Sequence, residues 1–187
     1  MSVNAAPTNS IRFQVVDELG APVRDAVVEL DASAKGPGPI RFAWRNAMAQ
    51  KGLQFTPGTL VVPKGSLVAF PNLDQVRHSV YSFSKPARFS IELYGRDQTR
   101  TQGFPIVGSV AIGCNIHDQM RGYIRVVDTP FAGKTDGNGM LTLTAMPAGP
   151  AKVTVWHPAA RAPKNELVQS IAVASGAATR KIAIRLR

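Results

Sequence analysis

The residues best suited to chemistry lie in one short run, residues 113–120, which reads GCNIHDQM. It contains Cys114, the single cysteine of the chain, with His117 three positions and Met120 six positions further on. Thiolate and imidazole ligands select copper or zinc, and two imidazoles, one thiolate and a weak axial thioether form the trigonal blue-copper arrangement. A second imidazole is needed, and His78 is the strongest candidate. These four residues predict a soft-metal site with copper as the preferred ion, and zinc would fit the same pocket.

Cys114 also has simpler interpretations. A lone cysteine cannot form an internal disulfide, so it is a buried apolar side chain, a reactive thiol, a link between two chains or a metal ligand. A buried structural thiol is the common outcome, but it leaves the spacing of His117 and Met120 unexplained. The spacing therefore favours a metal ligand.

The elements that must position these side chains are short strands. Alternating apolar and polar segments, separated by Gly, Pro and Asn-Gly type turns, are typical of an all-β sandwich. His78 begins one predicted strand and Cys114 ends another, so rigid elements deliver both ligands. One segment, Ile40–Gln50, has apolar residues at helical spacing and is predicted to be a short helix. The predicted strands are Ile11–Val16, Ala26–Leu30, Thr59–Val62, Ser66–Phe70, His78–Phe83, Arg88–Leu93, Ser109–Cys114, Gly122–Val127, Met140–Thr144, Lys152–Trp156, Gln169–Val173 and Arg180–Leu186.

Two phrases surround the candidate ligands. Residues 60–72 read L-x-V-x-x-G-x-x-V-x-F-x-N, and His78 follows after five further residues. Residues 104–122 read F-x3-G-x5-C-x2-H-x2-M-x-G. With these spacings, the stretch from Leu53 to Val127 resembles the cupredoxin family, in particular its amicyanin and methylamine-utilisation branch, in which a Trp replaces Phe70. The resemblance implies a Greek-key β-sandwich that binds one type 1 copper ion through His78, Cys114, His117 and Met120.

The same resemblance implies roles for neighbouring residues. Asn72 would fasten the two ligand-bearing loops together and hydrogen-bond near the sulfur, and Asn115 is the other expected neighbour of the ligands. His117 would be the partly exposed ligand through which electrons pass. Asp118 and Gln119 replace a Pro and an aromatic residue of amicyanin, which weakens the expectation of an apolar docking surface. Gln119 also competes with Met120 as the axial ligand, since glutamine fills that role in some blue-copper sites.

A second pattern flanks this stretch. The phrase G-x-P-V-x-D-A-x-V begins at Gly20, and T-D-x-x-G begins at Thr135, where a turn rich in Gly and Asn predicts a β-hairpin. Both phrases resemble carboxypeptidase-regulatory-like or transthyretin-like sandwiches. We therefore expect a flexible tail over residues 1–10, opening strands and linker over 11–51, an inserted cupredoxin domain over 52–127 and the rest of a smaller sandwich over 128–187.

The chain has a formal net charge of +10. The basic residues are scattered singly, without the basic and aromatic interleaving of a nucleic-acid groove, so an acidic redox protein is the expected partner and nucleic acid is not. In the last strand, Ile182 and Ile184 alternate with Lys181 and Arg185, which predicts one core face and one solvated basic face. No apolar run is long enough to span a bilayer. We expect a periplasmic protein whose leader is absent from this sequence, because a thiol-reducing cytosol competes for copper.

Three functions fit these features. The first is a one-electron copper carrier between periplasmic partners, and the second is a copper buffer or sensor, although the Met-rich or His-rich runs common in such proteins are missing. The third is a metal-free adhesion or scaffold module. Enzyme activity is not expected, because His157 is the only histidine outside the site and no serine stands in a nucleophile motif.

Overall fold

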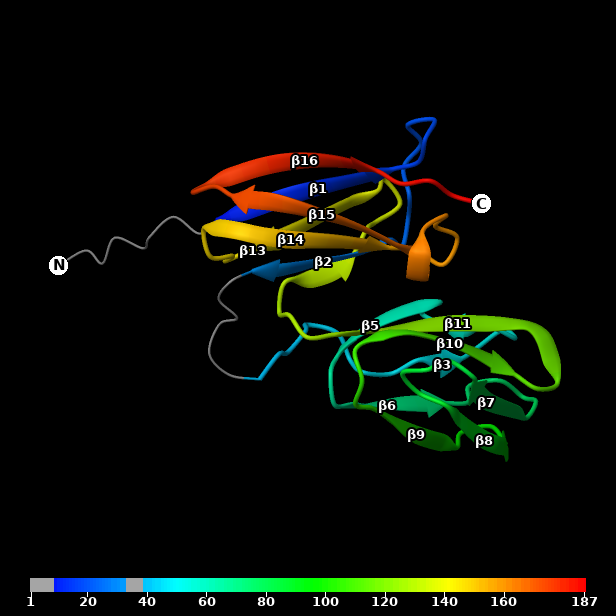
Figure 1. Ribbon diagram of the computed structural model, residues 1–187. Helices are drawn as coiled ribbons and strands as arrows, with labels where there is room; N and C mark the ends of the chain where they lie inside the picture. Colours follow the sequence, from blue (N-terminus) through cyan, green and yellow to red (C-terminus); the bar gives the residue numbers. More distant parts are fainter. Residues whose placement is uncertain (1–8, 33–38) are drawn as a thin grey trace. The chain divides into compact units, whose positions relative to one another are not determined.

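The structure, a computed structural model, describes residues 9–32 and 39–187 (Figure 1). Within these residues the protein is built from strands, and its only helical element is a short 3-10 turn, Pro163–Asn165. The prediction of an all-β fold is confirmed. Among the described residues, no helix is long and apolar enough to cross a membrane. Residues 1–8 of the predicted tail lie outside the described part of the chain.

The chain divides into two compact units, each with its own hydrophobic core. The first unit joins Met1–Gly38 with Thr129–Arg187, and the second is the continuous segment Pro39–Asp128. All four predicted metal ligands belong to the second unit. That unit also contains residues 39–51, which we expected from the sequence to belong to the opening strands and linker over residues 11–51.

The first unit consists of two sheets. Its strands are β1 (Ser10–Val16), β2 (Val27–Ala32), β12 (Ala132–Lys134), β13 (Met140–Thr144), β14 (Gly149–Trp156), β15 (Glu166–Val173) and β16 (Ala177–Ala183). The strand orders are β13-β1-β16 and β12-β2-β14-β15. Ile11, Phe13 and Val15 are at most 1% exposed, because alternate side chains of a strand point to the same face. Ile182 and Ile184 are buried and Lys181 and Arg185 are exposed, as the alternation predicted.

The second unit contains the candidate metal site. Its strands are β3 (Ala49–Gln50), β4 (Phe55–Thr56), β5 (Thr59–Pro63), β6 (Ser66–Pro71), β7 (His78–Ser82), β8 (Phe89–Tyr94), β9 (Thr99–Phe104), β10 (Gly108–Cys114) and β11 (His117–Val127). The largest sheet has the order β5-β11-β10-β7-β8, and β6-β9 and β3-β4 form two smaller sheets. Aromatic side chains fill much of the core, with Phe70, Tyr94 and Phe104 at most 1% exposed.

The helix predicted for Ile40–Gln50 is wrong. The segment instead runs beside β6, where Met48 donates its backbone N–H to the carbonyl of Ala69 at 2.9 Å. Gln50 forms a parallel bridge with Asn72. The few apolar residues at helical spacing are a weak local signal, and pairing with β6 gives the backbone its hydrogen-bond partners instead.

The hairpin predicted around residues 135–139 is also wrong, although the turn itself is present. Asp136 accepts the N–H groups of Asn138 and Met140 on Oδ1, and Gly139 has a φ of 71°. However, β12 pairs with β2, whereas β13 pairs with β1 in the other sheet. The turn residues fix the local reversal of the chain, but they leave open which strands become neighbours.

Candidate metal centre

Three adjacent strands bring the predicted ligands to one end of the largest sheet. His78 is the first residue of β7, Cys114 is the last of β10 and His117 is the first of β11. Both β7 and β11 pair with β10 in the antiparallel sense. The start of an antiparallel strand lies beside the end of its neighbour, so all three residues meet at the same edge.

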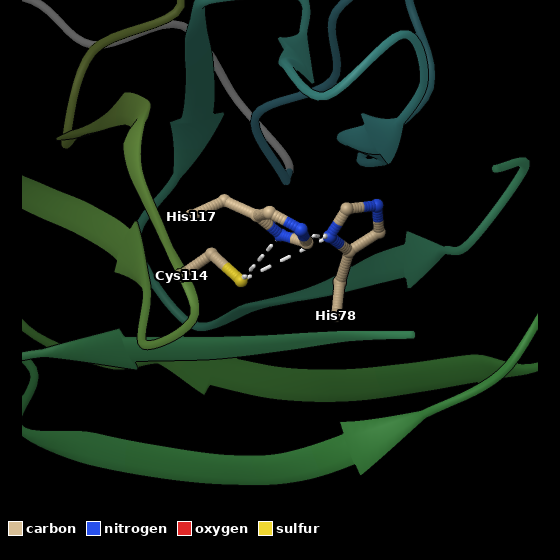
Figure 2. Close-up of side chains that lie close together, drawn as sticks. All are labelled: His78, Cys114 and His117. Atoms are coloured by element: carbon tan, nitrogen blue, oxygen red, sulfur yellow. Dashed lines mark hydrogen bonds between the residues drawn. The ribbon is translucent and has the colours of Figure 1, made fainter. Parts of the chain in front are cut away.

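The donor atoms converge on one point (Figure 2). Cys114 Sγ lies 3.6 Å from His117 Nδ1 and 3.8 Å from His78 Nδ1, and the two Nδ1 atoms are 3.1 Å apart. Metal bonds of roughly 2.0–2.3 Å to nitrogen and sulfur separate neighbouring donor atoms by about 3–4 Å. The spacing of these three atoms therefore suits one ion bound between them.

The three residues differ in exposure. His78 is 0% exposed and Cys114 is 3% exposed, whereas His117 is partly exposed. The partial exposure of His117 agrees with the prediction. A molecule in solution can approach this imidazole most closely, because the other two donors are covered by protein.

Met120 lies close by on β11 and is 1% exposed, in the same core cluster as Cys114. The register of β10 and β11 shifts between Cys114, which pairs with His117, and Gly113, which pairs with Arg121. This bulge accommodates residues 118–120. Gln119 is exposed, so burial favours the thioether of Met120 over the amide of Gln119 as the axial ligand.

Asp74 is a residue that the sequence analysis missed. Its Oδ2 lies 2.9 Å from His78 Nε2, and it accepts the backbone N–H groups of Gly52 at 2.6 Å and Leu53 at 3.0 Å. Burial acts to raise the pKa of Asp74, but the hydrogen bonds from Leu53, Gly52 and His78 outweigh it and lower that pKa. An ionised carboxylate only accepts hydrogen bonds, so His78 carries its hydrogen on Nε2 and leaves the Nδ1 lone pair toward the site.

Ser79 was also missed. Its hydroxyl donates to Cys114 Sγ at 3.7 Å and accepts the backbone N–H of Asn115 at 2.9 Å. Ser79 therefore ties the first ligand strand to the loop after Cys114. Asn115 takes part in this link through its backbone, and its side chain is exposed.

Asn72 is fully buried, but its contacts differ from those that the resemblance implied. Its Nδ2 donates to the carbonyls of Val76 and Tyr94 at 2.9 and 3.1 Å, and its Oδ1 accepts the N–H of Asp74 at 2.9 Å. These bonds organise the loop before His78. Within the described residues, the side-chain link to the cysteine loop is made by Ser79 instead.

His157 belongs to the first unit, whereas the predicted ligands belong to the second. Its Nδ1 accepts the backbone N–H of Ala159 at 3.2 Å. Burial lowers the pKa of His157, although the charge of Asp25 acts in the opposite direction. A local structural role accounts for this histidine.

Searches of protein-family models and of curated protein sequences find no match to this chain. Among solved structures, part of the chain is similar in fold to copper proteins. A purple cupredoxin from Nitrosopumilus maritimus aligns at 18% identity and a TM-score of 0.39, covering 43% of this chain and 98% of its own. A mutant of amicyanin in its reduced Cu(I) form aligns at 16% identity and a TM-score of 0.42, covering 54% of this chain and 98% of its own.

The copper-containing nitrite reductase of Thermus scotoductus SA-01 aligns at 25% identity and a TM-score of 0.42. That alignment covers 62% of this chain but only 28% of the reductase. Because all three TM-scores are low, the metal assignment rests on the side chains themselves. A thiolate and two imidazoles whose ligand atoms all lie within 4.8 Å of one another, beside a buried methionine, fit a single type 1 copper ion.

Proposed function

We propose that the protein is a one-electron carrier that binds one type 1 copper ion and passes electrons between redox partners in the periplasm. The convergence of Cys114 Sγ with the Nδ1 atoms of His78 and His117 carries this proposal. When bound, copper supplies the Cu(II)/Cu(I) couple. The chain itself performs no substrate chemistry in this proposal.

The ligand residues must be in the correct protonation states to bind the ion. Cys114 has to lose its thiol proton to bind, and binding of the metal drives that loss. Both histidines bind as neutral imidazoles. Asp74 Oδ2 lies 2.9 Å from His78 Nε2, on the side of the ring away from the other two donors. Because the donors sit on paired strands, they have little freedom to rearrange when the charge on the ion changes.

Electron exchange would take place at the end of the unit where His117 reaches the surface. Exposed apolar side chains occur in the three loops that meet there: Leu53 is 50%, Leu73 49% and Ile116 52% exposed. Asp118 and Gln119 are exposed as well, so the surface combines apolar and polar groups. A short-lived complex with a partner suits such a surface.

The charge of the chain indicates the nature of that partner. A net charge of +10 attracts an acidic protein over distances of roughly 8 Å at physiological salt. We therefore propose an acidic redox partner, whose association should slow as salt is added. The periplasmic setting is supported by the chemistry, because cytosolic thiols hold their compartment reducing and compete for copper.

The deciding test is to add Cu(II) to the reduced, metal-free protein and record the visible and EPR spectra. We expect an intense charge-transfer band that disappears with a reductant and returns with an oxidant. Cys114→Ser should remove the band, and His157→Asn, in the other unit, should leave it unchanged. A colourless Cu(II) complex of the wild-type protein would overturn the proposal. Slow electron self-exchange with very tight Cu(I) binding would instead indicate a copper buffer.

A further inference from the structure

We propose that Asp74 is a positioning residue for the metal site, and that the turn at Gly52 and Leu53 holds its carboxylate against His78. The effects on copper rest on the function proposed above. We call the hydrogen-bonded set of Gly52, Leu53, Asp74 and His78 the brace. The brace rests only on the contacts among these four residues.

The first part of the brace fixes the imidazole. His78 is fully buried, and its Nε2–H donates to Asp74 Oδ2 at 2.9 Å. The same ring turns Nδ1 toward Cys114 and His117 (Figure 2). A neutral imidazole has one protonated nitrogen, so a hydrogen bond to carboxylate at Nε2 leaves Nδ1 free to bind a metal. Without this partner the two tautomers would compete.

The second part of the brace fixes the carboxylate. Residues 51–54 form the turn between β3 and β4, closed by the bond from Lys51 N–H to the carbonyl of Gln54. Gly52 and Leu53 have φ values of 63° and 57°, the left-handed conformation at both central positions. This conformation is unfavourable for leucine. It turns two successive N–H groups toward Asp74, one to each carboxylate oxygen.

The backbone of Asp74 is fixed as well. Its N–H donates to the buried Asn72 side chain, which in turn donates to the carbonyls of Val76 and Tyr94. Asp74 therefore does more than cap a surface turn, since one carboxylate oxygen accepts both the Leu53 N–H and His78 Nε2–H. The strained turn, the carboxylate and the ligand form one connected unit.

The chemical consequence follows from the charge of the carboxylate. A hydrogen bond to an anion makes an imidazole a stronger electron donor, and this favours Cu(II) over Cu(I). Outer partners of this kind typically contribute 10–100-fold to metal affinity. Asp74 should thus tighten Cu(II) binding and lower the reduction potential.

The first experiment needs no metal. Nitrogen NMR of the reduced, copper-free chain reports which nitrogen of His78 carries the hydrogen. Wild type should show the Nε2–H form, and Asp74→Ala should show a mixture. Asp74→Asn should retain the Nε2–H form, because its amide oxygen still accepts the bond. Asp97→Asn, which changes an aspartate whose side chain is 76% exposed, should match wild type. An unchanged tautomer in Asp74→Ala would overturn the brace.

The second experiment measures Cu(II) affinity by chelator competition, together with the reduction potential. Asp74→Ala should bind 10–100-fold more weakly than wild type and have a higher potential. Asp74→Asn should fall between them. Asp97→Asn, at an exposed position outside the brace, should bind Cu(II) with the affinity of wild type. Equal affinities for wild type and all Asp74 variants would overturn the metal-binding role. If wild-type protein lacks a type 1 spectrum, the proposed function fails, and the NMR result still decides the brace.

Discussion

The hydroxyl of Ser79 lies 3.7 Å from Cys114 Sγ and accepts the backbone N–H of Asn115 at 2.9 Å. One buried side chain thereby contacts the sulfur ligand and fixes the loop that follows it. Ser79 comes directly after His78, so the two ligand-bearing segments are joined at the metal site itself.

Replacing this serine should alter both the potential and the stability. In Ser79→Ala the sulfur loses a hydrogen bond that withdraws charge from it, so we expect a lower reduction potential and a shifted charge-transfer band. The partly buried N–H of Asn115 also loses its acceptor, at a cost of about 0.5–1.5 kcal/mol of unfolding free energy. Voltammetry and denaturant unfolding measure the two effects. Ser90→Ala, at an exposed position of β8, is the matched control, and a potential equal to wild type would contradict the expectation.

Tyr81 lies directly over Gly113, the residue before Cys114. A methyl group added at Gly113 would lie 2.8 Å from the Tyr81 hydroxyl oxygen and 2.9 Å from its ring carbon Cζ. Gly113→Ala should therefore force the ring aside and destabilise the chain by about 1–3 kcal/mol, as overpacking generally does. Denaturant unfolding of the metal-free protein measures this cost. In the double variant with Tyr81→Ala the cost of Gly113→Ala should largely disappear, and purely additive effects would contradict the contact.

A pair of neighbouring substitutions tests the axial ligand. Met120→Leu keeps the buried volume but removes the thioether, so the EPR parameters should change and the reduction potential should rise. Gln119→Ala changes an exposed residue and should leave both quantities unchanged. The opposite pattern would assign the axial position to Gln119.

Metal binding should stabilise the folded chain through linkage. With free copper a thousandfold above Kd, the expected gain is about 4 kcal/mol of unfolding free energy. Cys114→Ser should lose this gain while its metal-free stability stays close to that of metal-free wild type. Thermal unfolding with and without Cu(II) measures the difference. Equal stabilisation of both proteins by copper would mean that the ion binds elsewhere.

His157 should make the stability depend on pH. Burial lowers its pKa in the folded state, so the unfolded chain binds a proton more readily. Stability should therefore fall as the pH drops through the unfolded value, near 6.5, and should level off below the folded pKa. His157→Asn retains an acceptor for the Ala159 N–H but does not titrate. Unfolding of the metal-free proteins between pH 8 and 5 should show less slope for the variant, and parallel slopes would contradict the prediction.

Much of the fold was predictable because strand alternation and turn residues are local properties. The segments that became β1, β5, β6 and β13 were found to within about one residue at each end, since each alternates clearly or is bounded by turn residues. Strands β3, β4, β9 and β12 were missed. Strands β3, β4 and β12 have only two or three residues, too few to show an alternation of apolar and polar side chains. Strand β9 is mostly exposed and has few apolar residues to show one.

The sequence by itself determined which donor atoms are available and placed His78 and Cys114 at strand ends, because ligand chemistry and strand pattern reside in the residues themselves. Only the tertiary structure decided which groups hold those donors. Asp74 reaches Gly52 across 22 residues, and Ser79 reaches Cys114 across 35. Neither aspartate nor serine carries a local signal for such a role. Their partners are set by which strands and turns become neighbours, and that depends on how the whole unit buries its core.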